Sequence, residues 1–351
     1  MADIHQSIFL LGATGYLGSQ LLVLLSASSI NYHVVALVRA ANQEKEEKLK
    51  SIHHNLSVVK GSLDDHEIIT EQASKAKYVI NCASSDHPGS IKDRAPPAAI
   101  LEGLEKQSAN RPGDPPVYIH VSGLALLNDN ARGELVPEDQ IPRYTDIGFS
   151  LDQVPDDAPH KNCDSLIVAA GTRRQNPVRT VIAYPGWIFG VGEGIKKSTR
   201  AIDLFLNTWK PIRYAGTWGP GHNSMNNIHV KDAANALLLI LQAAIDGKAD
   251  EGAEGFYFLA GDEPNVTFHD IATVMGDMMF EKGVHIKGGS EALPTSITEP
   301  YGEFFWKLFA ANHRAVPQRL KRLGWKATET SKLPLLESLP KEVEAVLRQA
   351  Q

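Results

Sequence analysis

Cysteine is nearly absent from this 351-residue chain, with only Cys82 and Cys163 present. Two cysteines are too few for a disulfide framework and indicate a reducing compartment. Long apolar runs are also missing, since no stretch reaches the roughly 18 residues that a membrane-spanning helix requires. The amino terminus lacks the basic segment of a secretory signal and leads directly into a strand-like run. These absences predict a cytoplasmic protein with no membrane partner.

The chain has no excess of basic residues. Its 35 lysines and arginines are outnumbered by 41 acidic residues, which gives a formal net charge of -6. Nucleic-acid-binding domains usually carry a basic face, so this balance argues against a nucleic-acid partner. The metal-binding signature HExxH and the hydrolase signature GxSxG are missing as well, and we expect no metal site.

Apolar runs alternate with helical patterns along the first half of the chain. The strand-like runs cover residues 7–12, 33–39, 56–61, 77–83 and 116–123, and a further one covers 179–185 after a helix from about 160 to 176. Near-continuous apolarity is typical of strands buried on both faces. The alternation therefore predicts an α/β fold with a Rossmann-type, doubly wound parallel sheet. The polar segment 124–158 is too long for a plain connector and indicates a functional loop or minor structure.

From Gly186 onward the pattern changes to glycine-rich loops and helices. We predict a dinucleotide-binding domain made of residues 1–185 and about 222–262. A smaller, mainly helical substrate lobe is expected from about 186–221 and 263–351. Aromatic residues in or near this lobe favour an apolar or aromatic substrate: Trp187, Phe189, Phe205, Trp209 and Trp218.

Gly12, Gly15 and Gly18 lie in "GATGYLG", between the first strand and the first helix. Such a turn lets the backbone approach a pyrophosphate while the helix N–H groups and dipole face the anion. Arg39 ends the second strand, where an acidic residue would bind the ribose hydroxyls of NAD and an arginine suits the 2′-phosphate of NADP. No acidic residue occurs from 33 to 41, so the sequence favours NADP over NAD.

The ordered motifs "GATGYLG", "GSLDD", "NCAS", "IHVSG", "YPGWIFGVG" and "NNIHVKDAANALLL" resemble the extended short-chain dehydrogenase/reductase family, which includes NAD-dependent epimerases and dehydratases. The resemblance covers nearly the whole chain and implies a Rossmann domain with a smaller substrate lobe. It implies an adenine beside Leu63 and Asp64, a cofactor ribose beside Ala83, and a nicotinamide near residues 185–188. The cofactor-binding residues predicted from the glycine motif and the resemblance are Gly12, Thr14, Gly15, Tyr16, Leu17, Gly18, Arg39, Leu63, Asp64, Ala83, Ser84, Pro185, Trp187 and Ile188.

The chain lacks the Tyr-x-x-x-Lys motif that this family usually carries at the start of the helix near residue 160. In the family the tyrosine transfers a proton, while the lysine binds the nicotinamide ribose and lowers the tyrosine pKa. No tyrosine of this chain is followed four positions later by a lysine. The corresponding positions are His160 and Asp164, which would share one helical face. The chain therefore resembles an atypical branch in which His-x-x-x-Asp replaces the usual pair.

His160 is our candidate for direct proton transfer, because histidine titrates near neutral pH. Asp164 cannot lower the pKa of a neighbouring acid as a lysine does, but it could orient the imidazole and accept hydrogen bonds from the nicotinamide ribose. Ser122 is expected at the family's serine position, which Gly123 would take if the register shifted by one residue. The alternative is that His160 only caps the helix.

Other residues are weaker candidates. Asp86 and His87, after the fourth strand, could supply an acid, and Tyr144 and Trp218 are predicted near the substrate. His120, on a buried strand, is expected to be a core residue, and neither cysteine is expected to act as a nucleophile.

The leading prediction is an NADP-dependent oxidoreductase that moves a hydride between nicotinamide and a small carbonyl or alcohol substrate. A homodimer is the assembly we would expect if the chain self-associates. Two alternatives stay open, because the usual Tyr–Lys pair is missing. One is a non-redox epimerase, isomerase or lyase on the same fold, and the other is an NADP-sensing regulatory protein without turnover.

Overall fold

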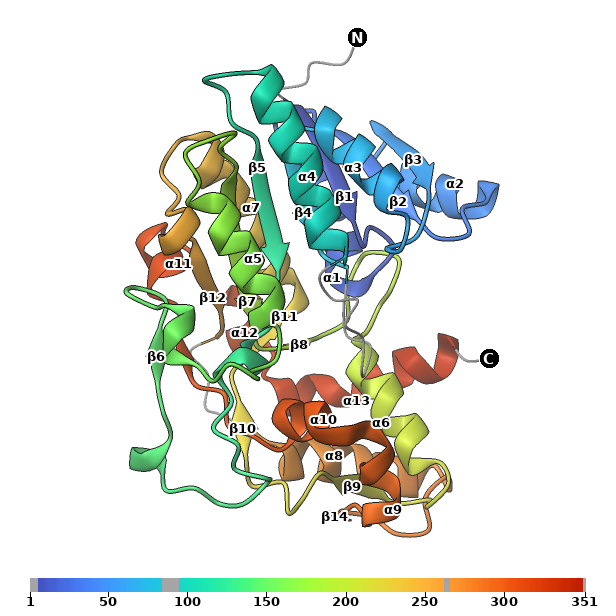
Figure 1. Ribbon diagram of the computed structural model, residues 1–351. Helices are drawn as coiled ribbons and strands as arrows, with labels where there is room; N and C mark the ends of the chain where they lie inside the picture. Colours follow the sequence, from blue (N-terminus) through green and yellow to red (C-terminus); the bar gives the residue numbers. More distant parts are fainter. Residues whose placement is uncertain (1–5, 84–94, 262–265, 350–351) are drawn as a thin grey trace.

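A seven-stranded sheet forms the centre of the protein (Figure 1). The structure is a computed structural model that describes residues 6–83, 95–261 and 266–349. All neighbouring strands of the sheet are parallel, in the order β12-β7-β5-β4-β1-β2-β3. The predicted Rossmann-type α/β fold is confirmed. The strands are β1 (Ser7–Leu11), β2 (His33–Val38), β3 (Leu56–Lys60), β4 (Tyr78–Asn81), β5 (Val117–Val121), β7 (Arg179–Pro185) and β12 (Phe256–Leu259).

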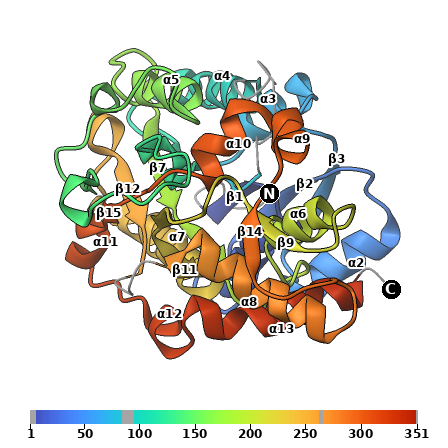
Figure 2. The same ribbon diagram turned by 90° about the horizontal axis from the view of Figure 1, so that it is seen from below.

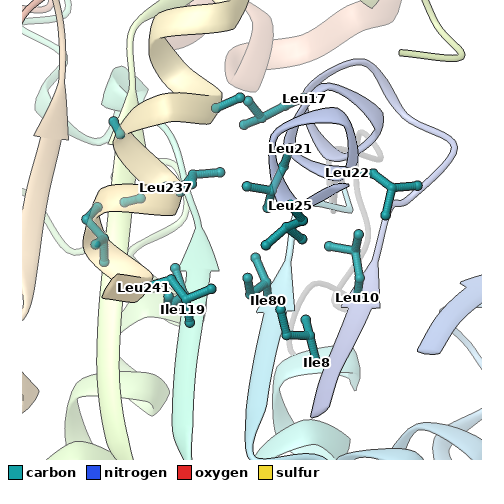
Figure 3. Close-up of a cluster of buried hydrophobic side chains, with 14 of the residues drawn as sticks. Ile8, Leu10, Leu17, Leu21, Leu22, Leu25, Ile80, Ile119, Leu237 and Leu241 are labelled. Atoms are coloured by element: carbon teal, nitrogen blue, oxygen red, sulfur yellow. The ribbon is translucent and has the colours of Figure 1, made fainter. Parts of the chain in front are cut away.

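Helices cover both faces of this sheet. The near face in Figure 1 carries α3 (His66–Lys75), α4 (Ala95–Asn110) and α5 (Lys161–Gly171). The other face carries α1 (Tyr16–Ser26) and α7 (Val230–Ile245), with α2 (Gln43–Ile52) beside β3. Figure 3 shows leucines of α1 and α7 packed on isoleucines of the strands, for example Leu21 and Leu237 near Ile80 and Ile119. Each such fully buried side chain contributes about 1.5–3 kcal/mol, which fixes the layers against one another.

The strand order reverses at β1 and β4. The chain winds from β1 to β2 and β3, and then crosses to β4 on the other side of β1. Ligands of open α/β sheets bind beyond the carboxyl ends of the strands at such a point. In Figure 1 the arrow of β5 shows that these ends face the smaller lobe.

The smaller lobe lies at the carboxyl edge of the sheet (Figures 1 and 2). Its core is aromatic, with Phe205 stacked on Trp187 and Trp209 at ring-centroid distances of 5.8 and 5.4 Å. The five aromatic residues that favoured an apolar substrate are all buried in this core, so they no longer support that inference. The lobe contains α6 (Arg200–Trp209), α8 (Phe268–Glu281), α9 (Thr295–Thr298), α10 (Gly302–Phe309), α13 (Leu335–Gln349), β9 (Ala215–Thr217) and β14 (Ser290–Ala292).

One segment departs from the expected division of the chain. We expected residues 263–351 in the lobe, but α11 (Gln318–Arg322) and α12 (Thr328–Lys332) contact β12 and α7 of the Rossmann domain. Leu320 and Trp325 lie in the same hydrophobic cluster as α1 and α7. This return explains the difference, because the segment buries its apolar side chains on the larger domain.

The remaining elements are short. The long polar segment carries the minor structure that we expected, in η3 (Leu124–Leu127), η4 (Glu138–Gln140), β6 (Tyr144–Thr145) and η5 (Leu151–Gln153). Within the described ranges, no helix combines the length and apolarity needed to cross a membrane. The other short elements are β8 (Trp187–Phe189), β10 (Ser224–Met225), β11 (Asn227–His229), η6 (Gly252–Glu254), β13 (Val266–Thr267), η7 (Glu299–Tyr301) and β15 (Ala315–Val316).

Candidate functional site

At Gly12 and Gly18, the turn between β1 and α1 leaves no room for a side chain. Gly12 has a φ of +82°, and a Cβ there would lie 2.7 Å from the backbone nitrogen of Ala83. A Cβ on Gly18 would lie 2.2 Å from the carbonyl oxygen of Gly12, and the N–H of Gly15 donates to that oxygen at 2.8 Å. The turn therefore brings the start of α1 to the carboxyl ends of β1 and β4, where open α/β sheets bind a pyrophosphate.

Thr14, Tyr16 and Leu17 complete this turn. Thr14 is partly exposed, whereas the side chains of Tyr16 and Leu17 are buried. The first N–H groups of a helix have no acceptor within the helix. Tyr16 and Leu17 can therefore bind an anion through their backbone, while their side chains hold the helix in place.

Arg39 borders a pocket at the end of β2. Lys60, which ends β3 in register with Val38 of β2, adds a second cation to its wall. Asp65 is turned into its own loop, where its carboxylate accepts the N–H of Ser62 at 2.6 Å. The pocket has a volume of about 370 Å³ and is lined by Arg39, Ala40, Lys60, Gly61, Ser62 and Asp65.

The loops after β3 and β4 hold residues predicted to face the adenosine. Leu63 is partly buried against the hydrophobic cluster beneath α3 and α4, and Asp64 beside it is exposed. Ala83 follows β4, and its N–H donates to the side-chain oxygen of Asn81 at 3.1 Å. These residues lie at the carboxyl edge of the sheet. Three other predicted residues fall outside the described ranges: Ser84, Asp86 and His87.

Pro185, Trp187 and Ile188 lie at the other end of the predicted cofactor site. Pro185 ends β7, and β8 begins with Trp187, which pairs with Asn227 of β11. The Trp187 ring is buried and stacked on Phe205, so its side chain does not face the crevice. A cofactor contact at this position can come only from the backbone.

Ser122, His160 and Asp164 meet at the carboxyl end of β5. The Ser122 hydroxyl donates to Oδ2 of Asp164 at 2.9 Å. His160 is partly exposed and directly precedes α5, and its Nε2 lies 3.2 Å from the point that a Cβ on Gly123 would occupy. The absence of a side chain at Gly123 therefore leaves the space that the imidazole fills.

We expected His160 and Asp164 on one helical face, but only Asp164 lies within α5. His160 is the N-cap of α5 and has left-handed backbone angles (φ 69°, ψ -20°), which are uncommon outside glycine. Asp164 is fully buried in the first turn of α5, with Oδ2 bonded to Ser122. Its Oδ1 is also buried and has no hydrogen-bond partner among the described residues, and the predicted contact with the nicotinamide ribose stays a prediction. Asp164 supports Ser122 and His160 from behind.

The pKa of the Asp164 carboxyl departs from its usual value. Burial raises its pKa to about 6, while His160, the Ser122 hydroxyl and the Tyr184 hydroxyl partly offset this rise. Tyr184 lies in β7 and is fully buried, and burial together with the Asp164 charge raises its pKa well above the usual value. The Ser122 hydroxyl is the hydrogen-bond donor to this carboxyl, and His160 and Tyr184 lie near enough to influence its charge.

Helix α10 of the lobe approaches the same site. Its Phe304 contacts the His160 ring edge-on, with a centroid distance of 6.3 Å. Its Lys307 donates to the backbone carbonyl of Asp157 at 2.9 Å, which ties the helix to the segment before His160. His160 therefore stands between the Rossmann domain and an apolar wall of the lobe.

Trp218 and Tyr144, the two remaining substrate candidates, both pack against other aromatic rings. Trp218 is fully buried, with its ring 5.3 Å from that of Phe309, so it belongs to the lobe core. This contradicts a substrate contact of its side chain. Tyr144 is partly buried in β6 and packs edge-on against Phe149 at 6.1 Å.

Comparison with known proteins agrees with this architecture. Residues 5–93 match the NmrA-like family. The chain is 26% identical to the oxidase ucsJ of Acremonium sp over 361 residues, which covers 98% of this chain and 97% of that protein. A solved dTDP-glucose 4,6-dehydratase from Bacillus anthracis, in complex with NAD, superposes with a TM-score of 0.66 at 14% identity, covering 97% of this chain and 96% of that one. The yeast methylglyoxal/isovaleraldehyde reductase Gre2, complexed with NADPH, gives a TM-score of 0.59 at 16% identity, covering 98% and 100%.

The chain shares the fold of these solved dehydratase and reductase structures.

A second polar cluster lies next to Asp164 in the core. The Tyr118 hydroxyl is 3.0 Å from Nδ1 of His120, and Nε2 of His120 is 3.6 Å from Sγ of Cys163. The amide nitrogen of Asn81 also faces Nδ1, at 3.4 Å. A donor at Nδ1 favours the tautomer with its proton on Nε2. His120 is buried and hydrogen-bonded, as predicted for a core residue, and burial lowers its pKa to about 3.

The same cluster contains a potential set of metal ligands. In the described part of the chain, His120, Cys163 and Asp164 bring one ligand atom each to within 4.8 Å of one another. A metal would need Nε2 of His120 as an electron-pair donor and Cys163 as a thiolate. The hydrogen bonds favour a proton on Nε2, so we assign these residues to the polar core. Sequence reasoning missed the cluster, because its members come from β4, β5 and α5.

Proposed function

We propose that the protein is an NADP-dependent oxidoreductase that transfers a hydride between nicotinamide and a small carbonyl or alcohol. The observation that carries this proposal is the cluster of Ser122, His160 and Asp164 at the carboxyl end of β5, beside the crevice that begins at the glycine-rich turn. Names of relatives point the same way, since one is called an oxidase and the yeast neighbour is a reductase complexed with NADPH.

The preference for NADP rests on Arg39 and Lys60. Both are exposed at the ends of adjacent strands and border one pocket. Each could donate charge-assisted hydrogen bonds to a 2′-phosphate, at roughly 1.5–3 kcal/mol per bond. The carboxylate of Asp65, which could otherwise bind the ribose hydroxyls of NAD, already accepts the N–H of Ser62.

The proton chemistry follows from the cluster. When bound, the cofactor supplies the hydride. His160 is the partly exposed titratable group of the three residues, and in the direction of reduction it donates a proton to the substrate oxygen. Asp164 lies behind the imidazole and balances the charge of its protonated form. The Ser122 hydroxyl donates its hydrogen bond to Asp164, so the Ser122 oxygen can still accept a hydrogen bond from a substrate hydroxyl. Phe304 offers an apolar surface next to the reacting oxygen.

Titration with NADPH and NADH, followed by a panel of carbonyl substrates, tests the proposal. We expect tighter binding of NADPH and a substrate-dependent loss of nicotinamide absorbance. Arg39→Ala should weaken NADPH at least about tenfold, equivalent to about 1.4 kcal/mol, and leave NADH nearly unchanged. Equal weakening of both cofactors would contradict the phosphate assignment.

The panel also separates the alternatives. Product formation without net change of the cofactor would replace the oxidoreductase with an epimerase, isomerase or lyase. Binding of NADPH without turnover of any carbonyl or alcohol would favour a regulatory sensor.

A further inference from the structure

Asn81 forms hydrogen bonds with both polar atoms of its side-chain amide. It is the last residue of β4 and is buried. Its Oδ1 accepts the N–H of Ala83 at 3.1 Å, and its Nδ2 faces the Tyr118 hydroxyl at 3.5 Å. A buried amide destabilises a protein unless its polar atoms are hydrogen-bonded. Asn81 therefore fits its position only while it contacts both the loop after β4 and the interior of the sheet.

On one side, Asn81 fixes the backbone that follows β4. The N–H of Cys82 continues the pairing of β4 with β1, because it donates to the carbonyl of Leu11 at 3.0 Å. The next N–H, that of Ala83, donates to the Asn81 side chain instead. The Ala83 nitrogen lies 2.7 Å from the point that a Cβ on Gly12 would occupy. The Asn81 oxygen thus holds this loop directly against the glycine-rich turn.

On the other side, Asn81 begins a directed series of hydrogen bonds. Asn81 and His120 are register partners on β4 and β5, and Tyr118 lies two residues before His120, so the three side chains share one face of the sheet. Because the amide oxygen faces the Ala83 N–H, the amide nitrogen faces Tyr118 and His120, as a donor only. The Tyr118 oxygen accepts from it, and the Tyr118 hydroxyl donates to Nδ1 of His120 at 3.0 Å. The imidazole then carries its proton on Nε2.

His120 extends the series to the first turn of α5. Its Nε2 faces Sγ of Cys163 at 3.6 Å, which is within hydrogen-bonding distance for sulfur. The N–H groups of Cys163 and Asp164 both donate to the carbonyl of His160, at 2.9 and 3.0 Å. The hydrogen bond to Cys163 therefore supports the turn that begins at His160. Asp164, the residue after Cys163, accepts the Ser122 hydroxyl in the same turn.

We infer that Asn81 is a positioning residue that aligns the cofactor with the proton-transfer segment. Its oxygen holds Ala83 against the glycine-rich turn, and its nitrogen supports the start of α5 through Tyr118 and His120. A displacement of about 1 Å between reacting groups can slow a reaction about a hundredfold, so a single amide that fixes both segments would matter for catalysis. The inference rests on the proposed function, because it relates the bound cofactor to His160.

Substitutions at Asn81 separate its two roles. Asn81→Asp keeps the size of the side chain and the acceptor of the Ala83 N–H, but it lacks the donor to Tyr118. Asn81→Ala removes both interactions. Tyr118→Phe interrupts the series without touching Ala83, and it serves if Asn81→Asp fails to fold. Gln107→Ala is the matched control, because Gln107 is an equally buried amide whose Nε2 donates to a backbone carbonyl just before β4 begins, at 2.7 Å.

Three quantities are measured: the Kd for NADPH by fluorescence titration, the protonation of the His120 nitrogens by nitrogen NMR of labelled histidine, and amide hydrogen exchange of residues 160–166. The last two are measured without cofactor. For Asn81→Asp we expect a proton on Nδ1 of His120 and faster exchange, with a Kd within about twofold of the unmodified value. For Asn81→Ala we expect faster exchange and a Kd raised about tenfold, as for loss of one hydrogen bond. Tyr118→Phe should give faster exchange and an unchanged Kd.

Gln107→Ala should lower the melting temperature and leave all three quantities unchanged. If it altered Kd and exchange as much as Asn81→Ala does, Asn81 would be an ordinary buried amide and the inference would be overturned. Unchanged His120 protonation and unchanged exchange in Asn81→Asp would overturn it as well. If the unmodified protein binds neither NADPH nor NADH, the proposed function fails, while the two measurements without cofactor still decide whether Asn81 positions α5.

Discussion

Glu342→Gln should stabilise the protein in alkaline solution and leave its stability unchanged in acid. Burial raises the pKa of Glu342, in α13, from 4.5 to about 7, more than the Ser338 hydroxyl and the nearby Gly190 N–H lower it. The folded protein therefore binds this proton more tightly than the unfolded chain does. The stability that the proton contributes is complete below about pH 4.5, and it is lost as the pH rises through about 7.

The size of the effect follows from that pKa. At 1.36 kcal/mol per pKa unit, a rise from 4.5 to about 7 corresponds to about 3 kcal/mol of unfolding free energy. Glutamine cannot ionise, and it keeps the shape and the acceptor oxygen of the protonated acid. We therefore expect the variant to be more stable than the unmodified protein by about 3 kcal/mol at pH 8, and by almost nothing near pH 4.5.

Urea unfolding between pH 4.5 and 8.5, followed by tryptophan fluorescence, measures this difference. Glu344→Gln is the control, because Glu344 is exposed on the same helix. It should change the unfolding free energy by less than about 0.5 kcal/mol at every pH. A constant difference between Glu342→Gln and the unmodified protein across this range would refute the reasoning, because ionisation of Glu342 would then not be coupled to folding.

Three further substitutions probe the site. His160→Asn keeps a residue that tolerates the left-handed backbone, so kcat/KM should fall at least about tenfold while the Kd for NADPH stays within about twofold; an unchanged rate would eliminate His160 as the proton donor. Gly18→Ala forces a Cβ against the Gly12 carbonyl and should abolish dinucleotide binding, with about 1–3 kcal/mol lost in urea unfolding; normal binding would show that the turn can relax. Ser122→Ala removes a hydrogen bond to the Asp164 carboxylate, so the pKa of Asp164 should rise above about 6. Carbon NMR of the labelled carboxyl measures this pKa, and an unchanged pKa would show that the hydrogen bond is unimportant.

The sheet could be predicted because its signals are local. Strands β1 and β5 are runs of apolar residues short enough to be strands, and the glycines after β1 mark a turn that only they can adopt. The return of α11 and α12 to the larger domain has no local signal. It depends on contacts such as Thr330 with Asp232, whose partners are about a hundred residues apart.

The residues of the candidate site could be proposed from the sequence, but their geometry could not. Resemblance to a family aligned Ser122, His160 and Asp164 with known positions, and the structure brings the three together. Their directions depend on one backbone angle at His160 and on the core beneath α5, neither of which a residue spacing encodes. The burial of Glu342 could not be predicted from the sequence either, because a glutamate in an amphipathic helix is ordinarily expected on its exposed side.

The left-handed turn at His160 limits the evolutionary routes open to this protein. A tyrosine at 160 and a lysine at 164 would create the Tyr-x-x-x-Lys motif in the sequence alone. The new lysine would occupy the fully buried position of Asp164, where an ammonium group would face hydroxyl groups and no carboxylate of its own. Its tyrosine partner would inherit a backbone conformation that bulky residues rarely adopt. Acquiring the Tyr–Lys pair would require a new entry into α5 and a repacked core beneath it, so two point mutations would pass through unstable intermediates.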